Sequence, residues 1–245
     1  MVAKTSTPKL SLINQFSNFT RTTAGLEKTL RLIQSLAQIV LELDTDPTST
    51  TQWGTAKSQL ALTRRFFRFF AFIDCFDRVY DLLGGRGGGG GQGPFMTLVE
   101  IGRWSCLGLY FVLEDLTILH AMNVYHVSWN MPVLVEAYKF WFYALSLSIF
   151  GAVWGLLFTS SPSPGKTGGN GNKKGGKNAV KVARGDERHR AERRVLVKRI
   201  VVDGCDLLIP GVFVGWMNAS ELMVGVTMVV STVVSGGDVW GRAQV

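Results

Sequence analysis

The sequence is poor in charged residues and in the residue types that build catalytic or metal centres. Charged residues make up 18% of its 245 positions, whereas soluble domains usually carry about 25%. Its three cysteines, Cys75, Cys106 and Cys205, lie far apart in apolar surroundings, without metal-ligand spacing or a disulfide framework. No nucleophile–base pair or ligand cluster stands out among the remaining side chains. We therefore expect a protein that is not an enzyme and that holds no metal or cofactor.

Positive charge is concentrated in one part of the chain. The formal net charge is +8, and residues 159–200 alone contain twelve basic and three acidic side chains. Such an excess indicates an anionic partner, either lipid headgroups or nucleic acid. Surfaces that bind nucleic acid usually combine basic residues with aromatic ones, and residues 159–200 contain no Phe, Trp or Tyr. We therefore expect an anionic lipid bilayer as the partner and no nucleic acid.

One uncharged run is long enough to cross a bilayer. Residues 140–158 carry no charge over nineteen positions, and about 20 apolar residues suffice to span the hydrocarbon core. Residues 95–122 also read as a helix, but its apolar core, 104–113, is too short to span. We therefore predict a transmembrane helix near 140–158 and a packed or interfacial helix before it.

A second apolar region covers residues 207–234. It is interrupted only by three residues, Pro210, Asn218 and Glu221. A segment of this length crosses once with tilt, or forms a shallow hairpin that turns near residues 216–220. Because a carboxylate in lipid is costly, Glu221 is expected to face another helix, a water-filled cavity or the headgroups.

Changes in composition divide the chain into five segments of an all-α integral membrane protein, with amphipathic interfacial helices and one or two transmembrane helices. The segments are N-terminal amphipathic helices (1–83, with a polar lead over 1–20 and a Thr/Ser-rich loop after Pro47), a Gly-rich linker (84–94), a helical membrane region (95–158), a disordered basic loop (159–190), and a C-terminal helix with an apolar membrane segment (191–235).

The stretch 57–83 has two contrasting sides when it is wound as a single helix. One side is basic, and the other is apolar and mostly aromatic. Rings at the acyl boundary with guanidinium groups on phosphate are typical of an interfacial helix, although an amphipathic helix packed on a soluble core has a similar pattern. The low charge and the apolar runs favour the first interpretation. The residues predicted to bind lipid are Lys57, Arg64, Arg65, Phe66, Arg68, Phe69, Phe70, Ile73, Phe76, Arg78 and Tyr80.

Four stretches carry a family resemblance through their order and spacing: residues 25–36, 62–70, 107–116 and 197–210. They resemble the peroxin-11 family of peroxisomal membrane proteins, in its divergent fungal form. The resemblance implies a location in the peroxisomal membrane and an Arg-rich amphipathic helix that inserts into one leaflet. In that family the helix elongates the peroxisome before the fission machinery divides it. Carried over here, this role falls on residues 57–83, and we expect the chain to form a homo-oligomer.

A different function is also open at this point. Glu221, Pro210 and the glycine-bearing apolar helices are features of a channel for small metabolites. Insertion of the 57–83 rings into one leaflet would bend the membrane, whereas a channel would conduct solute. The first of these is the function that the sequence favours.

Overall fold

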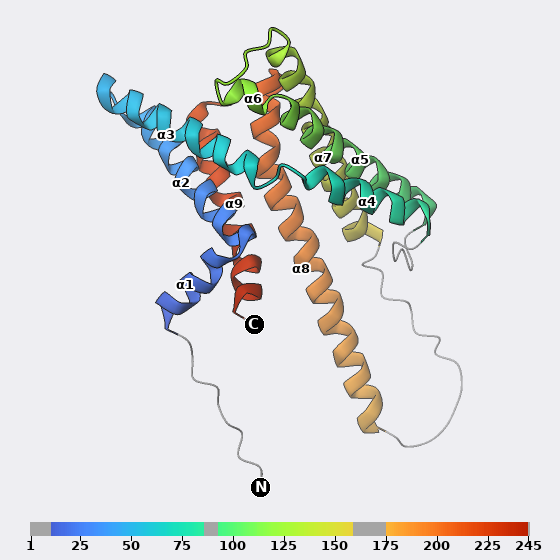
Figure 1. Ribbon diagram of the computed structural model, residues 1–245. Coiled ribbons are helices and arrows are strands. Elements are labelled where there is room, and N and C mark those ends of the chain that lie inside the picture. Colours follow the sequence, from blue (N-terminus) through green and yellow to red (C-terminus); the bar gives the residue numbers. More distant parts are fainter. Residues whose placement is uncertain (1–10, 86–92, 159–174, 245) are drawn as a thin grey trace.

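The computed structural model describes residues 11–85, 93–158 and 175–244, except for the side chains of 175–186 and 188. All regular secondary structure in these ranges is helical (Figure 1). The nine helices in the described residues are α1 (Leu12–Arg21), α2 (Thr23–Leu43), α3 (Pro47–Phe66), α4 (Ala71–Leu83), α5 (Pro94–Leu116), α6 (Ile118–Ala121), α7 (Asn130–Phe158), α8 (Gly175–Val214) and α9 (Glu221–Ala243).

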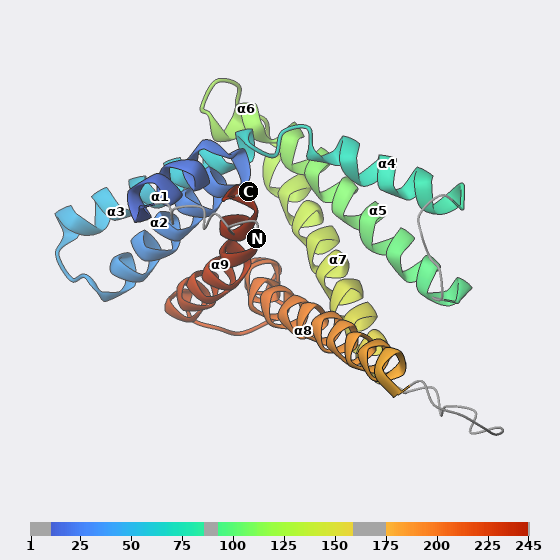
Figure 2. The same ribbon diagram turned by 90° about the horizontal axis from the view of Figure 1, so that it is seen from below.

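The helices form two arms joined by α8. Helices α2, α3 and α9 pack together in one arm, and α4, α5 and α7 pack together in the other. Helix α8 packs on α7 and on α9, so it holds the two arms together. Figures 1 and 2 show the arms diverging from a common region, with the connection from α3 to α4 carrying the chain from one arm to the other.

Local sequence explains several helix ends. The Asp46 side chain accepts hydrogen bonds from the backbone N–H groups of Thr48 and Ser49, and Pro47 occupies the first turn of α3. The corner between α1 and α2 requires glycine at position 25, because a Cβ atom there would lie 2.0 Å from the carbonyl oxygen of Phe19. The Asp46 cap therefore fixes the start of α3, and Gly25 allows the close corner between α1 and α2.

Three predicted boundaries in the N-terminal region are wrong. The polar lead contains helix α1, and the Thr/Ser run after Pro47 is the first part of α3. The stretch 57–83 is two helices, because residues 67–70 form a turn with i→i+3 hydrogen bonds such as Ala71 N to Arg68 O at 2.8 Å. The turn reorients α4 relative to α3, so α3 packs on α2 while α4 packs on α5.

The predicted disordered basic loop, 159–190, is wrong over its second half. Residues 175–190 belong to α8, and residues 159–174 lie outside the described residues. Most of the predicted Gly-rich linker, 86–92, lies outside them too. The predicted turn in the second apolar region is confirmed, because α8 ends at Val214, α9 begins at Glu221 and Gly215 between them has a φ of +81°.

The all-α membrane fold is confirmed, with more candidate spans than expected. Helices α5, α7 and α9 are each long and apolar enough to cross a membrane, judged by length and composition. Helix α7 contains the predicted span. Helix α5 was judged too short because its charges were taken as the ends of the apolar segment. In the structure Arg103 donates to Glu100 at 2.7 Å, so these two charges pair along one side of α5.

A close approach at Gly108 joins α4 to α5. A Cβ atom at this position would lie 3.0 Å from the ring of Phe76 and 3.3 Å from Cβ of Cys75. We expect Gly108→Leu to push α4 away and to lower the free energy of unfolding by about 1–3 kcal/mol, as overpacking does. Thermal unfolding of the purified protein in detergent measures the effect. Gly204→Ala is the control, because a Cβ atom there meets nothing within 4 Å, and an equal loss in both variants would contradict the packing role of Gly108.

Candidate functional site

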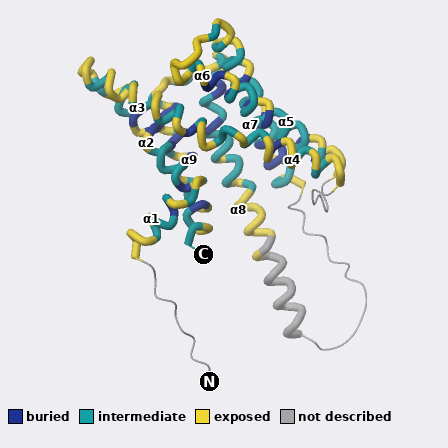
Figure 3. The backbone as a smooth tube through the Cα atoms, viewed as in Figure 1, coloured by how far each residue is buried: buried dark blue, intermediate teal, exposed yellow. Residues whose placement is uncertain are grey.

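Helix α2 turns its polar side inward and part of its apolar side outward. Arg31, Gln34 and Gln38 are buried, whereas Ile33 and Leu36 are 46% and 48% exposed. In Figure 3 the buried positions lie mainly where helices meet. A helix on a soluble core has the reverse pattern. An outward apolar side is suited to lipid, which makes this arrangement a membrane feature.

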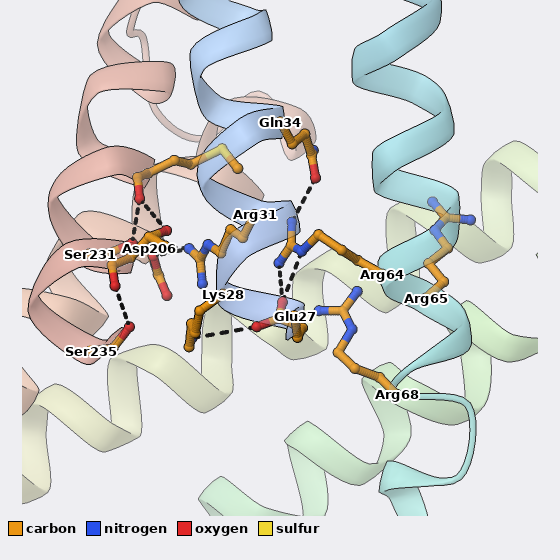
Figure 4. A network of polar contacts seen from close by, with 12 residues as sticks. Glu27, Lys28, Arg31, Gln34, Arg64, Arg65, Arg68, Asp206, Ser231 and Ser235 are labelled. Atoms are coloured by element: carbon orange, nitrogen blue, oxygen red, sulfur yellow. Dashed lines mark hydrogen bonds and ion pairs between the residues drawn. The ribbon is translucent and has the colours of Figure 1, made fainter. Parts of the chain in front are cut away.

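The polar sides of the helices meet in a cluster that we call the polar junction, and Figure 4 shows the part of it around Arg31 and Arg64. It is formed by residues of α2, α3, α5, α8 and α9 and by one arginine of the α3–α4 turn. Its members are Glu27, Arg31, Gln34, Arg64, Arg65, Arg68, Glu114, Asp206 and Ser231.

Arg31 connects three helices of the junction. Its guanidinium group forms an ion pair with Asp206 of α8. The same nitrogen, Nη2, donates to Oγ of Ser231 on α9 at 3.1 Å. Because both charged side chains are almost fully buried, each needs the other to offset its loss of hydration. This contact fixes α2 against the α8–α9 hairpin.

Arg64 joins α3 to α2. Its Nε donates to Glu27 Oε1 at 2.8 Å, and its Nη1 donates to Gln34 Oε1 at 2.7 Å. Burial acts to raise the pKa of Glu27, but the positive charges of Arg64 and Lys28 act the other way and leave this pKa below its ordinary value. Glu27 is therefore ionised at neutral pH and balances the buried arginine.

Glu114 gathers the remaining arginines. Both of its oxygens lie 3.1 Å from Nη2 of Arg68, and Oε1 lies 3.4 Å from Nε of Arg65. The hydroxyl of Tyr110 also donates to Oε1, at 2.9 Å. Burial disfavours the charge on Arg68, but Tyr110 and Glu114 outweigh this effect and raise the pKa of Arg68. Glu114 thus ties the end of α3 and the following turn to α5.

Two further groups of polar contacts lie outside the junction, one around Glu221 and one around Arg199. Lys57 Nζ lies 3.2 Å from Glu221 Oε2, and Gln38 Nε2 donates to the same oxygen at 3.0 Å. Glu221 therefore faces helix partners, as expected. In the second arm, Arg199 of α8 pairs with Glu100 of α5 at 3.0 Å and donates to Ser148 of α7 at 2.7 Å.

The predicted basic side of 57–83 faces protein over most of its length. Lys57, Arg64, Arg65 and Arg68 all contact carboxylates of other helices, and Arg78 on α4 is exposed. The expectation that these guanidinium groups meet lipid phosphate does not agree with these contacts. A helical wheel shows which residues share a side, whereas the tertiary packing decides what that side meets.

The predicted aromatic side lies largely at the surface. Phe66, Phe70, Ile73 and Tyr80 are 50–68% exposed. Of the other two predicted residues, Phe76 is partly covered by Gly108 of α5, and Phe69 packs edge-on against Phe70 with ring centroids 4.9 Å apart. The rings are therefore not sealed inside a compact body, which was the alternative for this stretch.

Sequence reasoning missed the acidic half of the junction. Glu114 was not among the predicted site residues, yet it is 2% exposed. Glu27, Arg31 and Asp206 were not singled out either. One signal was available: a carboxylate that adjoins a long apolar segment usually has a buried partner.

Comparison with known proteins gives one match. The family model described as Peroxisomal biogenesis factor 11 (PEX11) matches residues 13–240, which is nearly the whole chain. Neither the curated proteins nor the solved structures give a match. The matched range includes all members of the polar junction and the complete aromatic side of 57–83.

Proposed function

Because the chain belongs to the peroxisomal biogenesis factor 11 family, it is a peroxisomal membrane protein with a role in peroxisome biogenesis, and we propose that it elongates this membrane before fission. The inserted element in this proposal is the apolar surface of the α3–α4 region, defined as Phe66, Phe70, Ile73, Tyr80 and Leu83. Insertion into one leaflet expands that leaflet relative to the other and favours positive curvature. The family is one of biogenesis factors and is not a known enzyme family.

The exposure of this apolar surface is the observation that supports the proposal. Large apolar side chains exposed together mark a membrane or protein contact, and these five come from the end of α3, the turn and α4. A fully buried side chain of this size contributes about 1.5–3 kcal/mol. Because each of the five is 50–69% exposed in the structure, lipid supplies roughly half of that per side chain.

The charge on α4 changes the expected lipid preference. The polar side of α4 carries three acidic residues and one basic residue, namely Asp74, Asp77, Asp81 and Arg78. Attraction to anionic lipid therefore does not come from this helix. In our proposal the anionic bilayer is instead met by α8, where Arg190, Arg193 and Arg194 are exposed.

The proposal retains two protein partners, further copies of the chain and the fission machinery. In the most apolar 18-residue segment of each candidate span, only 22% of α5, 22% of α7 and 33% of α9 is buried. The rest of each segment is an apolar surface on which further copies could pack within the bilayer. Self-association would concentrate the inserted α3–α4 surfaces in one membrane region.

Substituting aspartate at Phe66, Phe70 and Ile73 tests the insertion step. We expect full-length protein carrying all three changes to enter liposomes but to lose tubulation, because three charges cannot enter the acyl region. Electron microscopy of the vesicles measures tubulation, and flotation measures membrane association. The matched control replaces the same residues with leucine and should tubulate as wild type does. Tubulation that persists in the aspartate variant would show that another element bends the membrane.

The alternative function, a metabolite channel, has one supporting observation. Glu221 lines a charged cavity between helices of both arms, as a residue on a solute path would. It is also held there by Lys57 and Gln38. This arrangement describes a binding cavity more closely than a through-going pore, and membrane elongation remains our proposal.

A further inference from the structure

A cavity of about 510 Å³ lies beside the polar junction. Residues of α2, α3, α5, α7, α8 and α9 and of the α3–α4 turn line it, so both arms and α8 contribute to its walls. Its volume falls within the range of about 300–1,000 Å³ that is usual for small-molecule sites. The cavity is independent of the outward apolar surface proposed to insert into lipid.

The cavity has more positive than negative charge. Five basic side chains line it: Arg31, Lys57, Arg64, Arg65 and Arg68. Four carboxylates contact these five, namely Glu27, Glu114, Asp206 and Glu221. Only two of these carboxylates, Glu114 and Glu221, line the cavity themselves, and Glu114 is shared by Arg65 and Arg68. The lining is therefore more basic than acidic, which favours an anionic ligand.

Two buried donors in the cavity wall lack acceptors. Nε of Arg31 and Nε of Arg68 are buried and make no hydrogen bond to any described residue. The Arg31 residue as a whole is only 7% exposed. Buried polar groups are almost always paired, and a lost partner costs about 1–3 kcal/mol. Both arginines line the cavity, so the anionic head of a bound ligand would lie among their guanidinium groups.

The remaining wall of the cavity is apolar and aromatic. Tyr110 stacks on Trp141 with ring centroids 5.1 Å apart, and Tyr138 stacks on Phe213 at 4.1 Å. Val224 and other aliphatic side chains complete this wall. A small inorganic ion would leave it uncovered, whereas a molecule with an alkyl chain would fill it.

We propose that the cavity binds an anionic amphiphile, with a phosphate or carboxylate head at Arg31 and Arg68 and an alkyl chain along the aromatic wall. This chemistry is shared by a lipid taken from the bilayer and by a free single-chain amphiphile. The basic lining suits a head with one or two negative charges. Binding would join the two arms, since both contribute to the wall.

The test uses full-length protein in nanodiscs of neutral lipid, with dodecyl phosphate as the probe. We expect saturable binding of one dodecyl phosphate per chain in calorimetry, and at least ten-fold weaker binding of inorganic phosphate, which lacks the chain. Dodecyltrimethylammonium has the same chain with a positive head and should not compete. Equal binding of the cationic and anionic probes, or no saturable binding of dodecyl phosphate, would overturn the proposal.

Two variants locate the site. Arg68→Gln removes the unpaired donor and a charge while Arg65 still pairs with Glu114, and we expect affinity for dodecyl phosphate to fall about ten-fold. Ala61→Trp fills the cavity from α3 and should abolish binding, which keeps the test decisive if the first variant is unstable. The control is Arg21→Gln, which removes an exposed charge that does not line the cavity. Unchanged affinity in a folded Arg68→Gln or Ala61→Trp protein would refute the assignment.

A last comparison distinguishes the two sources of the ligand. A two-chain phosphatidic acid with short acyl chains competes with dodecyl phosphate if the site takes bilayer lipid. If it does not compete, the site takes a single-chain free amphiphile. Either result identifies the ligand class within the proposal, because the head chemistry and the variants are the same in both.

Discussion

Glu114→Ala is expected to lower the free energy of unfolding by about 3–5 kcal/mol, the usual cost of removing one partner of a buried ion pair. Glu114 is 2% exposed and neutralises both Arg65 and Arg68. Its loss leaves two guanidinium groups and the hydroxyl of Tyr110 without their acceptor. The end of α3 and its following turn should then separate from α5, which would open the junction between the two arms.

Thermal and chemical unfolding in detergent measure this effect, and the far-ultraviolet circular dichroism of the helices monitors the unfolding. The matched control is Glu136→Ala on α7, where an exposed carboxylate pairs with Lys139 at 2.6 Å one helical turn away. Surface pairs of this kind contribute about 0–1 kcal/mol, so the control should stay close to wild type. If both glutamate variants lose the same small amount, Glu114 does not hold the junction together.

The Arg31–Asp206 pair should show a comparably large effect with a different signature. Asp206→Leu leaves Arg31 buried and uncompensated, and we expect a loss of about 3–5 kcal/mol. Removing both charges, as Arg31→Met with Asp206→Leu, should restore much of this loss, because well-packed apolar residues replace a buried pair at little cost. The double variant should therefore be more stable than the Asp206→Leu single variant.

A double-mutant cycle measures the coupling between the two side chains. For Arg31 and Asp206 we expect more than about 2 kcal/mol, given that they are in contact and almost fully buried. The pair of Lys198 and Asp238 serves as the control, since it lies at 2.6 Å but its aspartate is largely exposed; its coupling should stay below about 1 kcal/mol. Additive losses at Arg31 and Asp206 would mean that the pair does not connect α2 to α8.

Features with a strong local signal could be predicted from the sequence. The uncharged run 140–158 lies within α7, and the turn between α8 and α9 falls at the predicted position. Periodicity also separated the aromatic side of 57–83 from its basic side. These predictions succeeded because hydropathy, helical period and turn chemistry depend on neighbouring residues only.

Features that depend on distant contacts could not be predicted in this way. The break at 67–70 accompanies the packing of α3 and α4 in different arms. Helix α5 is a candidate span although it contains charged residues. Two of these, Glu100 and Arg103, pair with each other. Arg64, Arg65 and Arg68 have carboxylate partners 37 to 49 positions away in the sequence, as in Arg64 with Glu27 and Arg65 with Glu114, whereas Arg78, predicted on the same side, is exposed on α4. No local pattern reports such a pairing.

The sequence by itself therefore determined an all-α membrane protein, its family resemblance and the aromatic surface available for lipid. Only the tertiary structure decided that four basic residues of the 57–83 stretch, Lys57, Arg64, Arg65 and Arg68, pair with carboxylates of other helices. The physical reason is that a buried charged side chain needs an ion-pair partner, and the tertiary fold determines which opposite charges lie close enough to form that pair. Here the fold brings Glu27, Glu114, Asp206 and Glu221 to the arginines and the lysine, and a cavity forms beside them.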